Sequence, residues 1–138
     1  MTERTTTLNL LIVEDEALIA MTIEDALTSY GHRVVGIAED VASALSLARA
    51  HPVDLALCDV RLAHGDSGVD AAARLADRGI PVVYLSGNCP TDAAAPLVVG
   101  CISKPFRTAS LHASVLAAHA IAKGGSAIKA PEALALYA

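Results

Sequence analysis

Short apolar runs alternate along the chain with segments of helical periodicity. The apolar runs predict five buried strands, at residues 8–13, 34–37, 53–60, 80–85 and 100–103. Between and after them, apolar positions recur at the spacing of one helix face. These segments predict helices at residues 17–30, 41–50, 69–78, 90–99 and 108–122. The fourth of these helices contains Pro90 and Pro96 and is expected to be short or irregular, because proline interrupts helical hydrogen bonding.

Five successive strand–helix units predict an α/β fold. Strands that alternate with helices form a parallel sheet with helices on both faces, and strands buried on both faces are apolar along their length. We therefore expect one domain at residues 1–122, a doubly wound sheet of five parallel strands. Residues 123–138 contain the pair Gly124-Gly125 and are expected to form a flexible or loosely docked tail. Sites in such sheets lie beyond the carboxyl ends of the strands.

The composition is that of one globular domain and argues against several kinds of partner. Of the 138 residues, 54% are hydrophobic and 18% are charged, unlike a disordered chain. The formal net charge of −5, without a clustered basic stripe, argues against direct nucleic-acid binding. No apolar run reaches the roughly 20 residues of a membrane span. The three cysteines form no C-x-x-C pair, which predicts free thiols in a reducing cytoplasm.

Polar residues of complementary chemistry follow four of the predicted strands. In chain order they are Glu14-Asp15-Glu16, Asp59, Ser86 and Lys104. Because parallel strands end at one edge, these side chains are expected to converge there. Neighbouring carboxylates repel one another, and a set of oxygen ligands favours a hard cation such as Mg²⁺. A lysine and a hydroxyl beside the metal suit phosphoryl oxygens, and a carboxylate between them can act as a nucleophile that forms an aspartyl-phosphate.

Four motifs in this order resemble the receiver domain of bacterial response regulators. They are "LIVEDE", "LALCDV", "VVYLSGN" and "ISKPF", within a match of about residues 8–120. The resemblance implies a flavodoxin-like sheet with strand order 2-1-3-4-5. It also implies a Mg²⁺ site in which Asp15 is a direct ligand, Glu14 acts through water, and Asp59 and the backbone carbonyl of Arg61 complete the protein's share.

The same resemblance implies the roles of the remaining residues. Asp59 is expected to accept a phosphoryl group from a histidine kinase or a histidine phosphotransfer protein. Ser86 would follow that group, and Lys104 would pair with Asp59 or with the phosphoryl oxygens. The bond between Lys104 and Pro105 is expected to be cis. Such a single-domain regulator would signal through an unknown partner protein or a phosphorelay, and a homodimer is compatible with this role.

Two other functions stay open at this level. A small phosphohydrolase could also use an aspartyl-phosphate, but its general acid would be a second Asp two residues after Asp59, where this chain has Arg61. A non-phosphorylated pseudo-receiver would act only as an interaction module, yet the set of site residues is complete. The aromatic residue expected near the end of the fifth strand is replaced by Cys101. We therefore expect an order–disorder response of the segment after Ser86 in place of a ring movement.

Overall fold

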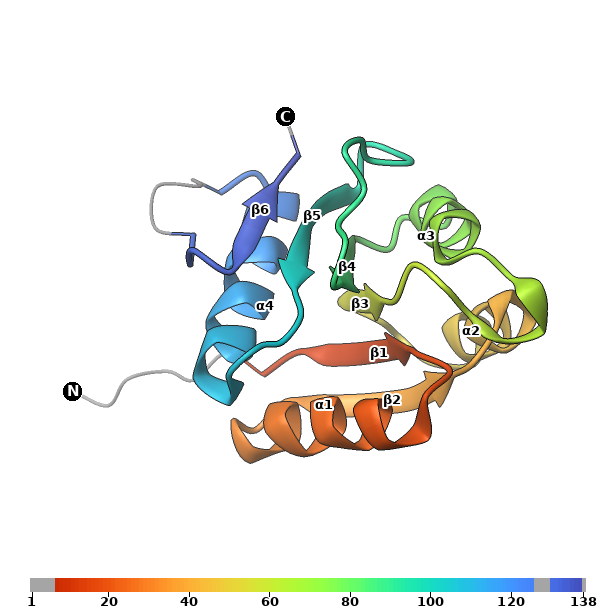
Figure 1. The fold of residues 1–138 in the computed structure, drawn as a ribbon, viewed down its shortest axis with the longest axis horizontal. Helices are drawn as coiled ribbons and strands as arrows, with labels where there is room; N and C mark the ends of the chain where they lie inside the picture. Colours follow the sequence, from red (N-terminus) through yellow and green to blue (C-terminus); the bar gives the residue numbers. More distant parts are fainter. Residues whose placement is uncertain (1–6, 126–129, 138) are drawn as a thin grey trace.

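A computed structural model describes residues 7–125 and 130–137. Its centre is a six-stranded sheet in the order β2-β1-β3-β4-β5-β6 (Figure 1). The strands are β1 (Asn9–Val13), β2 (Arg33–Ala38), β3 (Leu55–Cys58), β4 (Val82–Ser86), β5 (Val98–Ser103) and β6 (Leu134–Leu136). The first five run parallel. The expected flavodoxin-like sheet with order 2-1-3-4-5 is therefore confirmed.

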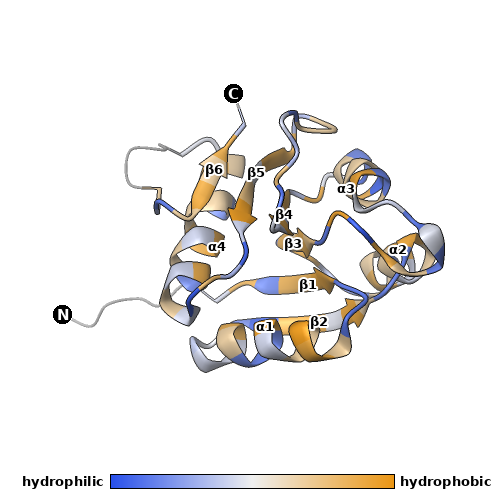
Figure 2. Cartoon of the chain, in the orientation of Figure 1, coloured by the Kyte–Doolittle hydropathy of each residue, from blue (hydrophilic) through white to orange (hydrophobic). Residues whose placement is uncertain are grey.

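Four α-helices cover the two faces of the sheet. They are α1 (Ala17–Ser29), α2 (Val41–Ala50), α3 (Gly68–Asp77) and α4 (Thr108–Ala122), with a short 3-10 turn, η1 (Ala63–Gly65), before α3. Residues of α1 and α4 share one apolar core with the sheet, and residues of α2 and α3 share the other. In Figure 2 the apolar colour is strongest on the strands between these helix pairs. No helix in the described part of the chain has the length and apolar character needed to cross a membrane.

The two cores explain why the strands are apolar along their length. In β1, Leu10 and Ile12 face the core with α1 and α4, whereas Leu11 and Val13 face the core with α2 and α3. Successive side chains of a strand point to opposite faces. A strand covered on both faces consequently has no solvent-facing position to fill with a polar residue.

The helix predicted at residues 90–99 does not form. Residues 87–97 make turns and bends, and Val98 and Val99 belong to β5. Pro90 and Pro96 each lack the backbone N–H that a helix interior requires. The expectation of irregularity in this stretch is confirmed, but the helix itself is wrong.

The prediction of five strands was one strand short. β6, in the tail, pairs antiparallel with β5, and Gly100 lies opposite Leu136. Gly100 permits this approach, because a side chain there would meet the carbonyl oxygen of Ala135 at 2.5 Å. The final described residues are therefore part of the sheet, while residues 126–129 of the expected tail lie outside the described residues.

Candidate functional site

The acidic pair follows β1 directly. The N–H of Glu14 donates to the carbonyl of Ala38 in β2 at 2.8 Å, which carries the strand pairing one residue beyond β1. The Glu14 residue is only 2% exposed, and its Oε2 accepts a hydrogen bond from the N–H of Glu16 at 3.2 Å. Asp15 is exposed. The sheet therefore buries one carboxylate and presents the next one to solvent.

Asp59 occupies the corresponding position after β3. Its N–H donates to the carbonyl of Val13 at 2.9 Å, and its Oδ1 accepts from the N–H of Val60 at 2.7 Å. Gly68, at the start of α3, packs against the backbone of this residue, so that a Cβ at position 68 would collide with the Asp59 carbonyl. The missing side chain of Gly68 thus lets the loop fold back over the strand end, a role that the sequence did not reveal.

Lys104 connects the buried Glu14 with the half-buried Asp59. Its N–H donates to the carbonyl of Ser86 at 3.0 Å. Its Nζ donates to Glu14 Oε1 at 3.0 Å and to Asp59 Oδ2 at 3.2 Å. The bond to Pro105 is cis, as expected. Side chains separated by 45 and 90 residues along the chain therefore meet at one edge of the sheet.

Lys104 brings one positive charge to the carboxylates of Glu14 and Asp59. Burial raises the pKa of Glu14 to about 7, and the charge of Asp59 adds to the effect; hydrogen bonds from Lys104 and from the N–H of Glu16 oppose it. Burial alone would lower the pKa of Lys104, but Glu14 and Asp59 outweigh burial and raise it. Lys104 therefore stays charged, and the carboxylates retain a demand for further positive charge.

A divalent cation would meet that demand. Carboxylate oxygens of Glu14, Asp15 and Asp59 lie within 4.8 Å of one another. A set of oxygen donors matches the preference of Mg²⁺. A cleft of about 710 Å³ lies over them, lined by Asp15, Glu16, Ile19, Asp59, Val60, Arg61, Ser86, Gly87, Asn88 and Lys104. The donor set fits the expected metal, and the role of the Arg61 carbonyl stays a prediction.

Ser86 lines the same cleft from the end of β4. The residue is 8% exposed, and its Oγ accepts a hydrogen bond from the N–H of Asn88 at 3.1 Å. The hydroxyl is thus held by its own turn. The hydrogen bond couples Ser86 to the turn that follows it, so a movement of Ser86 toward a phosphoryl group on Asp59 would be transmitted to the residues after it.

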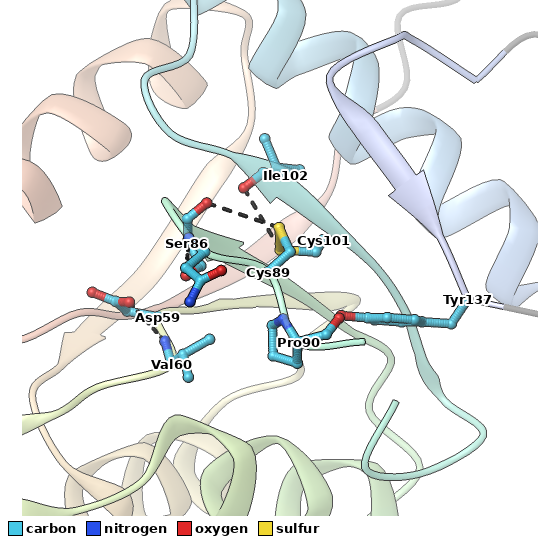
Figure 3. Close-up of a disulfide and its surroundings, with 9 residues drawn as sticks. Asp59, Val60, Ser86, Cys89, Pro90, Cys101, Ile102 and Tyr137 are labelled. Carbon is cyan, nitrogen blue, oxygen red and sulfur yellow. Dashed lines mark hydrogen bonds between the residues drawn. A yellow bond between two sulfur atoms is a disulfide. The ribbon is translucent and has the colours of Figure 1, made fainter. Parts of the chain in front are cut away.

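A disulfide corrects the expectation of three free thiols. Cys89 and Cys101 are bonded, with Cα atoms 6.0 Å apart, and Cys58 is the free cysteine. Figure 3 shows the bond beside Ser86, with Asp59 nearby. The two cysteines are separated by 12 residues and share no short motif. Only the return of β5 alongside β4 brings them together.

The fold and the site define a class of protein: a doubly wound α/β domain with an acidic pair, a strand-end Asp, a hydroxyl and a lysine at one edge. A family model described as the response regulator receiver domain matches residues 10–116. The chain belongs to this family.

Two curated relatives are regulators. The chain is 41% identical over 83 residues to the transcriptional regulatory protein PdtaR of Mycobacterium tuberculosis, covering 59% of this chain and 40% of PdtaR. It is 34% identical over 116 residues to the phyllosphere-induced regulator PhyR of Methylorubrum extorquens, covering 77% of this chain and 41% of PhyR. The chain thus spans less than half the length of these relatives.

Solved structures show the same fold. The signal receiver domain of a modulated diguanylate cyclase from Desulfovibrio desulfuricans G20 superposes with a TM-score of 0.76 at 30% identity, covering 86% of this chain and 98% of that one. The response regulator PhyR from Brucella abortus superposes with a TM-score of 0.66 at 33% identity, covering 87% of this chain and 48% of that one. The first of these likenesses extends over nearly the whole solved domain.

Proposed function

We propose that the chain is a phosphoacceptor in two-component signalling and takes a phosphoryl group on Asp59 from a phosphohistidine. The observation that carries this proposal is the position of Lys104, whose Nζ contacts both Glu14 and Asp59. One oxygen of Asp59 accepts from the Val60 N–H and the other from Lys104. These two hydrogen bonds orient the carboxylate, which also lines the cleft.

The transfer needs positioning and charge neutralisation more than covalent chemistry by the protein. The Asp59 carboxylate attacks phosphorus, the bond from phosphorus to the donor imidazole breaks, and the imidazole leaves with the electron pair. Mg²⁺ would supply positive charge for the phosphoryl oxygens, held by Asp15 and Asp59, by Glu14 through water and by the carbonyl of Arg61. Lys104 pairs with the phosphoryl oxygens, and Ser86 moves toward them. The chain would catalyse only its own phosphorylation and dephosphorylation.

The proposed partners are a sensor histidine kinase or a histidine phosphotransfer protein, and an output protein. PhyR from Bartonella quintana is described as an anti-anti-sigma factor, which favours output through another protein. A cytoplasmic location was expected from free thiols; it now rests on the family alone, because two of the three cysteines are bonded. The phosphohydrolase alternative lacks its general acid, since position 61 is Arg.

The decisive variant is Asp59→Asn. It keeps a side chain of the same shape but removes the nucleophile, so incubation with acetyl phosphate and Mg²⁺ should add one phosphoryl group to the wild type and none to the variant. Intact mass spectrometry reads the result. Asp77→Asn, an exposed substitution at the end of α3, is the matched control and should react like the wild type. Equal incorporation in Asp59→Asn would refute the assignment, and steady release of phosphate from an added phosphomonoester would revive the phosphohydrolase.

A further inference from the structure

Two of the contacts that hold the segment after Ser86, residues 87–97, link it to β5 and to the residue that follows β6. The disulfide ties Cys89 to Cys101 in β5. The hydroxyl of Tyr137, beyond β6, donates to the carbonyl of Pro90 at 2.7 Å. Figure 3 shows both contacts on the same short stretch of chain. A segment with no helix of its own is therefore held by contacts with the rest of the domain, and the disulfide makes one of them covalent.

The covalent fixing lies close to the residue that must move. Cys89 comes three residues after Ser86 and one after Asn88, whose N–H holds the Ser86 hydroxyl. Cys101 lies in the middle of β5, paired with Tyr84 of β4, and is fully buried. A movement of Ser86 toward Asp59 would pull on a chain that is anchored three residues later. The disulfide therefore opposes the rearrangement that the proposed function requires.

The two cysteine residues differ in burial. Cys89 is half-buried, whereas Cys101 is fully enclosed by the core with α2 and α3. The remaining cysteine, Cys58, is also fully buried. A cysteine enclosed in the core is structural and unreactive. We therefore expect a reductant to attack the bond at Cys89, the less buried of the two cysteines, without competition from Cys58.

We propose that the Cys89–Cys101 disulfide is a redox-sensitive modification site: while intact it restrains the phosphorylation-linked movement of residues 87–97, and a dithiol reductant releases that movement. The inference rests on the proposed function, since it concerns the response to a phosphoryl group on Asp59. It also fits the proposed compartment, because disulfides in a reducing compartment are usually transient or redox-sensing.

The chemistry is thiol–disulfide exchange. A thiolate of the dithiol attacks the sulfur of Cys89, a mixed disulfide forms, and Cys101 leaves as a thiolate that takes up a proton. The second thiolate of the reductant attacks the reductant sulfur of the mixed disulfide, and Cys89 leaves as a thiolate and is protonated. The protein gains two electrons and two protons, and the dithiol becomes a cyclic disulfide.

The experiment compares the oxidised protein with the protein reduced by dithiothreitol under native conditions. Thiol counting on the unfolded protein should find one thiol before reduction and three after it. Reduction should speed amide exchange at residues 87–97 at least threefold. Beryllium fluoride with Mg²⁺, used as a phosphoryl mimic, should then protect this segment in the reduced protein and change it little in the oxidised one. The apparent Kd of the mimic should be at least threefold lower in the reduced form.

Two variants serve as controls. The double variant with Cys89→Ser and Cys101→Ser should behave like the reduced protein with or without dithiothreitol. Cys58→Ser should keep the full redox response, because that thiol takes no part in the bond.

Three results would overturn the inference: three thiols in the untreated protein, a bond that native dithiothreitol does not reduce, or equal mimic affinity in both redox forms. The proposed function fails separately. If neither redox form takes up phosphate from acetyl phosphate, both proposals fall, whereas uptake by both forms together with equal mimic affinity overturns the redox inference alone.

Discussion

At the scale of single residues, the site has more negative than positive groups. The buried carboxylate of Glu14 and the half-buried carboxylate of Asp59 share one lysine through Lys104 Nζ. The exposed acid Asp15 adds a third negative group within 4.8 Å. Like charges at this distance disfavour one another. A cation that binds the folded state alone would therefore stabilise it.

The metal prediction follows from that imbalance. Asp15→Ala removes the exposed carboxylate, so the gain in unfolding free energy from Mg²⁺, about 3 kcal/mol at one hundred times the dissociation constant in the wild type, should fall by more than half. Without metal, the variant should be at least as stable as the wild type, because repulsion is relieved. Urea unfolding with and without Mg²⁺ measures both. Glu39→Ala, which removes an exposed acid from the separate group of Glu39, Asp40 and His64, is the control. An equal gain in wild type and Asp15→Ala would place the ion elsewhere.

At the scale of elements, a pair of histidines connects the edge of the sheet to α4. His32, just before β2, accepts the N–H of Leu8 on Nδ1 at 3.1 Å, so its Nε2 carries the proton and donates to His112 Nδ1 at 3.0 Å. Tyr30 stacks on His112 with ring centroids 4.0 Å apart. Protonation of His32 would place a donor against the N–H of Leu8, and protonation of His112 would place two donors face to face.

Acid should therefore weaken the contacts of His32 with Leu8 and His112. Burial lowers the pKa of both histidines from 6.5, and the charge of His112 lowers that of His32 further. Below pH 6.5 the unfolded chain then binds more protons than the folded one, so the unfolding free energy should fall as the pH falls through that value. We expect a loss of about 1–2 kcal/mol between pH 7.5 and 5.5, the scale of a broken buried hydrogen bond.

Urea titrations at the two pH values measure this change in unfolding free energy. His32→Asn keeps an acceptor for Leu8 that cannot be protonated, and it should flatten the pH dependence. His51→Gln, outside this contact, should leave it unchanged. A pH dependence that persists undiminished in His32→Asn would assign it to other groups.

At the scale of the whole molecule, the tail completes the sheet. Without β6, β5 would be an edge strand with unpaired backbone groups, a common site of unwanted association. β6 covers part of that edge, and Tyr137 extends the cover: its N–H donates to Val99 at 3.1 Å, and its ring packs on Tyr84 with centroids 6.1 Å apart. The end of the chain is thereby linked to the strand that carries Ser86.

Gly100→Ala tests this closure. The new methyl group would lie 2.5 Å from the carbonyl oxygen of Ala135, so β6 should be displaced at a cost of about 1–3 kcal/mol. Urea unfolding gives the cost, and faster amide exchange at Leu134–Leu136 should accompany it. Gly87→Ala, where nothing lies within 4 Å of the added atom, is the control for stability. Unchanged exchange in β6 would show that the strand does not depend on the close approach.

The sequence alone was enough for the parallel sheet and for the convergence of Glu14, Asp59, Ser86 and Lys104. Both results follow from local pattern: apolar runs buried on two faces identify the strands, and parallel strands present their carboxyl ends at one edge. The cis bond before Pro105 was expected from the family resemblance and is present.

Other features could not be predicted from the sequence, because they depend on which distant segments of the chain meet in the fold. The disulfide forms because β5 returns beside β4, β6 forms because Gly100 lets the tail approach, and Gly68 matters because a loop folds back on Asp59. None of these has a periodic or short-range signal, since each depends on the distance between residues far apart in the chain. The helix predicted at residues 90–99 failed for a related reason: helical spacing was present, but two prolines and a covalent tie to β5 fixed another path.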